Sequence, residues 1–118
     1  MLGLDHIALI VSSEESLRFY EKLGFREYKR FERSYDTVVF MKCGNIILEI
    51  FVDPNHPERV DCPEAKGLRH MAFTVDKIED LDMEMEEIRT DWFGRRFTFV
   101  KDPDGLPIEI KECGSTLT

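Results

Sequence analysis

The chain has 118 residues, of which 42% are hydrophobic and 34% charged, and its formal net charge at pH 7 is −8. These values predict one folded domain of ordinary size, exclude an intrinsically disordered chain, and argue against a nucleic-acid-binding protein, which needs a basic surface. No apolar run reaches the roughly 18 residues of a membrane span, and the N-terminus resembles no secretory leader, so we expect no membrane partner.

Residues 5–11 are apolar and rich in β-branched side chains, which predicts a first strand. A short helix is expected over residues 12–23, because Ser12 and Glu15 have the spacing of a capping box and Gly24 follows where a helix normally ends. Three further strands are expected at residues 25–33, 37–42 and 46–52, the last two joined by a hairpin turn at residues 43–45. The predicted order is β-α-β-β-β.

The second half of the chain follows a proline-containing stretch, residues 54–67, which we expect to be an extended linker. A strand is predicted at residues 68–75, and Asp76 and Glu79 then repeat the capping spacing. The helix expected there carries an apolar stripe made of Ile78, Leu81, Met85 and Ile88.

Two more strands are predicted at residues 97–101 and 107–111, around the strong turn signal of residues 102–105. Between Arg89 and Arg96 there is room for only a short strand. The second half therefore has the predicted order β-α-(short β)-β-β.

The two halves are internally similar. Residues 6–11 are echoed by residues 70–75, and Glu49 in one apolar strand is echoed by Glu109 in another, at offsets of 64 and 60. A repeat of this kind predicts two similar units of structure. We therefore expect an α+β fold with two βαβββ modules, residues 1–53 and 68–118, which together form a single domain over residues 1–118.

The repeat brings two histidines and two glutamates to equivalent places. Glu49 lies between Leu48 and Ile50, and Glu109 lies between Ile108 and Ile110. A buried, unpaired carboxylate costs several kcal/mol. Taken singly, either histidine could be a hydrogen-bonded core residue. Either glutamate could face solvent at a sheet edge or pair with a lysine. The candidate lysines are Lys42, Lys101 and Lys111.

These alternatives weaken when four residues recur in matched places, so we interpret His6, Glu49, His70 and Glu109 as the ligands of a divalent metal ion. Two neutral imidazoles and two carboxylates neutralise such an ion and suit Ni²⁺, Zn²⁺, Co²⁺, Mn²⁺ or Fe²⁺ better than Ca²⁺. Four protein ligands leave two octahedral positions open, which is typical of a catalytic metal site.

Several segments resemble the vicinal oxygen chelate superfamily, which includes glyoxalase I, bleomycin-resistance proteins and extradiol dioxygenases. The resemblance covers nearly the whole chain and rests on residues 5–8, 19–25, 69–73 and 99–105, the last leading to Ile108 and Glu109. Residues 63–70 and 96–99 are similar to the small YaeR-like, glyoxalase-related branch.

The resemblance implies sheets that curl around a metal cleft, with a ligand set of the glyoxalase I type at His6, Glu49, His70 and Glu109. Ni²⁺ or Zn²⁺ is the ion it favours. It also implies a lyase or isomerase in which a carboxylate abstracts a proton next to a carbonyl and the metal stabilises the enediolate. The proton acceptor would be Glu109, with Glu49 as the second acid/base or as a ligand only. The substrate would be a small molecule such as the thiol adduct of an α-oxo aldehyde.

Two alternatives remain open on this resemblance. One is an Fe²⁺ extradiol-type dioxygenase, in which Glu49 is not a ligand. The other is a non-catalytic protein that binds a drug or another small molecule without metal. Arg69, Arg95 or Arg96 could hold an anionic part of the ligand, although each could equally be a surface arginine.

Cellular location and assembly follow from simpler observations. Three cysteines without CxxC spacing indicate reduced thiols, so we expect a cytoplasmic protein. Exposed sheet edges, and the frequent pairing of such proteins about a two-fold axis, predict a homodimer.

Overall fold

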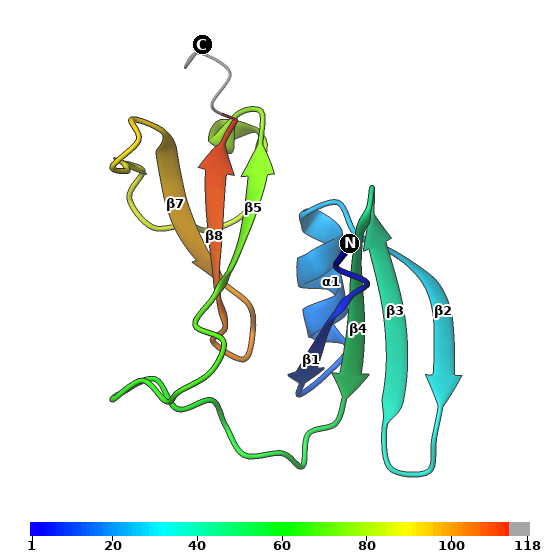
Figure 1. Ribbon diagram of the computed structural model, residues 1–118. Coiled ribbons are helices and arrows are strands. Elements are labelled where there is room, and N and C mark those ends of the chain that lie inside the picture. The colour runs from blue at the N-terminus through cyan, green and yellow to red at the C-terminus, as the bar shows by residue number, and fades with distance from the viewer. Residues whose placement is uncertain (114–118) are drawn as a thin grey trace. The chain divides into compact units, whose positions relative to one another are not determined.

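The structure is a computed structural model that describes residues 1–113. The chain forms two compact units, residues 1–58 and the part that begins at Arg59 (Figure 1). Each unit contains one four-stranded mixed sheet. The predicted α+β class is therefore confirmed, with strands as the dominant element.

Unit 1 has the predicted order of elements. These are β1 (Ile7–Val11), α1 (Glu15–Lys22), β2 (Arg26–Glu32), β3 (Thr37–Cys43) and β4 (Ile46–Val52). The strands lie in the order β1-β4-β3-β2, with β1 parallel to β4 and the other pairs antiparallel. Cys43 pairs with Ile46, so a two-residue hairpin joins β3 to β4, as the sequence predicts.

Helix α1 starts later than predicted but ends where expected. Glu14 occupies its N-cap without a side-chain cap, and the Glu15 amide donates to the Ser13 hydroxyl at 3.2 Å. At the other end, Gly24 adopts φ +111° and donates to the carbonyl of Glu21, while Phe25 donates to that of Tyr20. This is the Schellman pattern, and it needs the positive φ that glycine adopts most easily.

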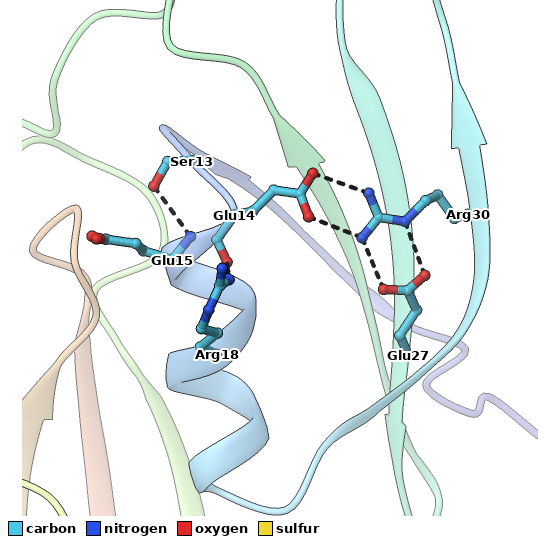
Figure 2. A network of polar contacts seen from close by, with 6 residues as sticks. All are labelled: Ser13, Glu14, Glu15, Arg18, Glu27 and Arg30. Carbon is cyan, nitrogen blue, oxygen red and sulfur yellow. Dashed lines mark hydrogen bonds and ion pairs between the residues drawn. The ribbon is translucent and has the colours of Figure 1, made fainter.

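The core of unit 1 lies on one face of its sheet. The sheet residues buried on this face are Leu9, Val11, Val39, Met41, Leu48 and Ile50, while Val38 is buried on the other face. Figures 1 and 2 show α1 lying along this sheet, and its buried side chains include Leu17 and Tyr20. Strand alternation places every second residue on the opposite face, where Ile10 is 55% exposed.

One arginine ties the start of α1 to the edge of the sheet (Figure 2). The Arg30 guanidinium on β2 donates to both carboxylate oxygens of Glu14, each at 3.1 Å, and to those of Glu27 at 2.9 Å. These contacts lower the pKa of both carboxyl groups, with the Arg30 hydrogen bonds as the largest cause. The helix is therefore fixed at its first turn through side chains as well as through the core.

Unit 2 repeats the sheet of unit 1. Its elements are β5 (Met71–Val75), the 3-10 turn η1 (Ile78–Asp80), β6 (Arg89–Thr90), β7 (Arg96–Lys101) and β8 (Pro107–Glu112). The order is β5-β8-β7-β6, with β5 parallel to β8. The turn at residues 102–105 is formed as predicted, with the Asp102 carboxylate accepting from the amides of Asp104 and Leu106.

The helix predicted in unit 2 is wrong. Only the single turn η1 forms, and Leu81, which follows it, is already extended at φ −85° and ψ 127°. Residues 81–86 alternate strictly between apolar and acidic side chains, and their burial alternates with them. That is the period of an extended segment, which the helical stripe obscured. Like charges four residues apart, such as Asp80 and Glu84, also disfavour a helix.

The extended segment is held to the sheet by hydrogen bonds. The Glu86 amide donates to the Phe99 carbonyl at 3.0 Å, and the buried Thr98 hydroxyl donates to the Glu86 carbonyl at 2.7 Å. Ahead of it, Ile78 is fully buried and its amide donates to the Glu112 carboxylate at 3.1 Å. The turn η1 and the extended segment of residues 81–86 therefore take the place of the second helix.

At eight residues α1 is too short to cross a bilayer, and nowhere in residues 1–113 is there a helix long and apolar enough to do so.

Candidate functional site

In unit 1 the structure brings His6 and Glu49 together. His6 lies one residue before β1, not inside it, and Ala8 of β1 is in register with Glu49 of β4. Alternation along the strand puts His6, Ala8 and Glu49 on one face. The His6 Nε2 atom is 3.2 Å from Glu49 Oε1, with the two side chains 38% and 22% exposed.

Unit 2 contains the same arrangement. His70 lies one residue before β5, and Ala72 is in register with Glu109 of β8. The His70 Nε2 atom is 3.1 Å from Glu109 Oε1, with the side chains 30% and 15% exposed. The Phe99 ring meets the His70 ring edge-on at 5.2 Å and is in register with Glu109. The duplication seen in the sequence therefore extends to strand register and side-chain contact.

The face that carries each pair is the less buried face of its sheet. In unit 1 it bears Phe40, in register with Glu49, and the exposed Ile10. In unit 2 it bears Phe99 in the matching place. A half-exposed face that combines apolar rings with a histidine and a carboxylate is typical of a small-molecule site.

Lys111, one of the lysines that could pair with the Glu109 carboxylate, pairs with Asp91 instead. The Lys111 Nζ atom is 2.6 Å from Asp91 Oδ2, and this contact is the main reason that the pKa of Asp91 falls to about 2. Lys42 and Lys101 are exposed. The carboxylates of both pairs instead meet imidazoles.

The two histidines differ in what holds the other side of the ring. Asp5 Oδ2 is 2.7 Å from His6 Nδ1, and this hydrogen bond is the largest cause that raises the pKa of His6 above its ordinary value. Desolvation of the ring opposes it, and the Glu49 charge adds to it. The residue before His70 is Arg69, whose guanidinium turns to Glu64 at 2.9 Å.

The donor set fits a divalent transition-metal ion. Two ligand atoms that are each about 2.1 Å from one ion lie roughly 3.0–3.4 Å apart at octahedral and tetrahedral angles. The nitrogen–oxygen distances of 3.2 and 3.1 Å in the two pairs fall in this range, which also suits a hydrogen bond. Within residues 1–113 there is no group of three or more His, Cys, Asp or Glu side chains that could hold an ion by itself. The structure thus describes two separate pairs of candidate ligands.

The three arginines that the sequence suggests for an anionic ligand all have protein partners. Arg69 pairs with Glu64, and Arg96 pairs with Glu79 and Glu112. Arg95 donates through Nε to the carbonyl of Glu112 at 2.9 Å. Each therefore already has a partner within unit 2.

Sequence reasoning missed two features of the site. The motif around His6 does not by itself indicate a role for Asp5, although an acidic residue directly before a candidate ligand is a usable signal. Phe40 and Phe99 read only as strand residues in the sequence, but their register beside the two glutamates makes them the apolar lining of each pair.

Comparison with known proteins finds relatives that match this chain over almost its whole length. The uncharacterized protein YwkD of Bacillus subtilis is 43% identical over 123 aligned positions, which cover 93% of this chain and 96% of YwkD. The uncharacterized protein YaeR of Escherichia coli is 40% identical over 129 positions, covering 95% and 99%. The crystal structure of a glyoxalase family protein from Enterococcus faecalis is 38% identical, with a TM-score of 0.83 and coverage of 93% and 97%.

More distant solved structures share the fold alone. Lactoylglutathione lyase from Agrobacterium tumefaciens is 21% identical, with a TM-score of 0.65 and coverage of 98% and 96%. The fosfomycin resistance protein FosX from Listeria monocytogenes is 21% identical, with a TM-score of 0.70 and coverage of 96% and 94%. The sequence pattern shared by one superfamily matches residues 3–110, nearly the whole chain, so the protein belongs to the Glyoxalase/Bleomycin resistance protein/Dioxygenase superfamily.

Proposed function

We propose that this protein is a metal-dependent lyase or isomerase of the glyoxalase type that acts on a small α-oxo aldehyde thiol adduct. The single observation that supports this most is the repeated pair of an imidazole and a carboxylate, at 3.2 Å in one unit and 3.1 Å in the other. His6, Glu49, His70 and Glu109 would be the ligands of one divalent ion, with Ni²⁺ or Zn²⁺ favoured and Co²⁺, Mn²⁺ or Fe²⁺ also suited to the donors.

When bound, the ion would supply Lewis-acid stabilisation of the negative charge that develops on the substrate oxygens. The protein's own residues would do the rest. Glu109 would accept the carbon-bound proton on a carboxylate oxygen and return it to the neighbouring carbon. Phe99, which is in register with Glu109 and packs on His70, would limit the access of water to that carboxylate. Glu49 would act as the second acid/base or as a ligand only.

The test of this proposal is Glu109→Gln, because the amide keeps the shape of the side chain but cannot accept the proton. We expect turnover of methylglyoxal plus thiol to fall by at least about 100-fold, the lower range for loss of an acid/base group. Metal content measured by elemental analysis should also fall, since a ligand charge is lost. The fold should stay intact by circular dichroism.

Glu84→Gln is the matched control, because Glu84 is an exposed carboxylate of the same unit. Its turnover and metal content should equal those of the wild type. Unchanged turnover in Glu109→Gln would rule out the proposed role. Oxygen uptake with catechols would instead favour the ring-cleaving dioxygenase, and ligand binding that chelators do not change would favour a non-catalytic binding protein.

Two further properties complete the proposal. A homodimer is supported by the strands at the ends of the two sheets, β1 and β2 in one and β5 and β6 in the other, because edge strands can pair with another chain. A cytoplasmic location is supported by the free state of all three cysteines, Cys43, Cys62 and Cys113. Light scattering and fractionation of cells test these two points.

A further inference from the structure

The duplication places residues of opposite charge next to the two histidines. Asp5 precedes His6 and Arg69 precedes His70, at the same offset of 64 that separates the histidines. The Asp5 carboxylate turns toward its own histidine, at 2.7 Å from Nδ1. The Arg69 guanidinium turns away and pairs with Glu64 at 2.9 Å. The two halves therefore carry the same pair of candidate ligands but support it differently.

The His6 ring lies between two carboxylates. Asp5 faces Nδ1 at 2.7 Å, and Glu49 faces Nε2 at 3.2 Å. When the ring carries a single proton, the shorter contact holds it on Nδ1, because a hydrogen bond to a charged acceptor strengthens as it shortens. The Nε2 lone pair is then left facing the same side as Glu49, which is the state a metal-binding imidazole requires.

The His70 ring meets a carboxylate through Nε2, where Glu109 lies at 3.1 Å. Its other support is the edge-on contact with Phe99, which cannot accept a proton in a conventional hydrogen bond. The carboxylate that precedes His6 in the chain therefore has no counterpart before His70, where Arg69 stands.

We propose that Asp5 is a positioning residue, which holds the His6 ring through Nδ1 so that Nε2 is directed to a divalent ion. The His6–Glu49 pair is then preorganised to bind an ion through the Nε2 atom of His6. This inference rests on the proposed metal-dependent function and deepens it by naming a residue that orients one of the ligands.

The experiment uses Asp5→Ala in the full chain. Asp5 has a side chain that is 93% exposed, so its removal should leave the fold unchanged. Zn²⁺ affinity of the metal-free protein is measured by competition with a chromophoric chelator. We expect Asp5→Ala to weaken Zn²⁺ binding by about 10- to 100-fold, the usual effect of losing such a carboxylate. Asp5→Asn, which keeps an oxygen acceptor, should lose less.

A second readout separates a positioning role from a merely structural one. Nitrogen-15 NMR of the metal-free protein, at a pH where the imidazole is neutral, reports which ring nitrogen of His6 carries the proton. We expect Nδ1 in the wild type and a shift of the proton to Nε2 in Asp5→Ala. Arg69→Ala is the matched control at the equivalent position, and it should change neither the His6 spectrum nor the Zn²⁺ affinity.

The outcomes are distinguishable. If the His6 proton occupies the same nitrogen in Asp5→Ala as in the wild type, the inference is overturned, whatever the Zn²⁺ affinity. A proton that moves while Zn²⁺ affinity stays the same also overturns it. If the wild-type protein binds no divalent ion at all, the proposed function fails, and the inference about metal positioning fails with it, although the NMR comparison still shows whether Asp5 orients His6.

Discussion

The two units reach the same arrangement of the candidate ligands with different covering layers. In unit 1 a complete helix, α1, lies along the sheet and buries Leu17 and Tyr20. In unit 2 the turn η1 and the extended segment of residues 81–86 take the place of the helix, and Ile78 is fully buried. Yet the register of histidine, alanine and glutamate is the same in both. The comparison shows that the parallel pair of strands defines the arrangement of the candidate ligands and that the covering layer can vary.

The reason is geometric. The histidine and the glutamate are attached to adjacent parallel strands, whose register is set by backbone hydrogen bonds and by the buried residues between them. Slipping either strand by one residue would turn the candidate ligand that it carries to the buried face. The covering layer needs only to fill the apolar face, which several kinds of element can do.

The largest expected change in the free energy of unfolding tests whether the covering layers of the two sheets protect the core equally. Ile50 and Ile110 directly follow the two glutamates and are both fully buried. Ile50→Ala and Ile110→Ala should each lower the free energy of unfolding by about 2–5 kcal/mol, measured by urea denaturation, because each leaves a cavity. Ile10→Ala, at a position 55% exposed, is the control and should cost far less.

The two covering layers would not be equivalent if Ile110→Ala lowered the free energy of unfolding much less than Ile50→Ala does. That result would mean that the thinner cover of unit 2 collapses into the cavity more readily than a helix does.

An intermediate effect is expected from the helix end that only unit 1 contains. Gly24 has φ +111°, and a Cβ added there would lie 3.3 Å from the Cys43 sulfur. Gly24→Ala should therefore lower the free energy of unfolding by more than about 1 kcal/mol, measured by urea denaturation. Gly3→Ala, with no atom within 4 Å of the added Cβ, should stay within about 0.5 kcal/mol of the wild type. Equal stability of the two variants would contradict the role given to Gly24.

The smallest effect concerns the charges of unit 2. The hydrogen bond from Lys111, followed by the amide of Arg95, lowers the pKa of Asp91 from 3.8 to about 2. A carboxyl with a lowered folded pKa stabilises the fold above its ordinary pKa, and this contribution is lost as the pH falls through the folded value. Asp91→Asn should thus be less stable than the wild type at pH 7, with the difference shrinking between about pH 4 and pH 2.

The measurement is the midpoint of urea unfolding across this pH range. Asp82→Asn, at an exposed position, is the control and should follow the wild type throughout. A difference between Asp91→Asn and the wild type that is the same at pH 2 and pH 7 would show that the ion pair with Lys111 contributes no stability.

Much of the fold could be predicted from the sequence because strands leave a regular apolar pattern. All the predicted strands are present within a few residues of their expected limits, including the short β6. The matched places of the histidines and glutamates predict the two pairs as candidates, and the structure brings the two members of each pair into contact. Their action on a shared ion stays a prediction.

The error at residues 81–88 has an equally physical origin. Apolar residues there match both a helical stripe and a strict alternation, so local pattern could not decide between a helix and an extended segment. Contacts with distant residues decided for the extended segment, because Thr98 and Phe99 of β7 form hydrogen bonds with the backbone of Glu86. Propensity differs by only a few tenths of a kcal/mol per residue, and such contacts outweigh it.

The sequence by itself determined the duplicated halves, the strands and the four candidate ligands, since all of these depend on residue type and spacing along the chain. Only the tertiary structure decided which carboxylate meets which ring nitrogen, that Lys111 belongs to Asp91, and that unit 2 has no long helix among its described residues. Those outcomes depend on side chains far apart in sequence, whose distances no local pattern contains.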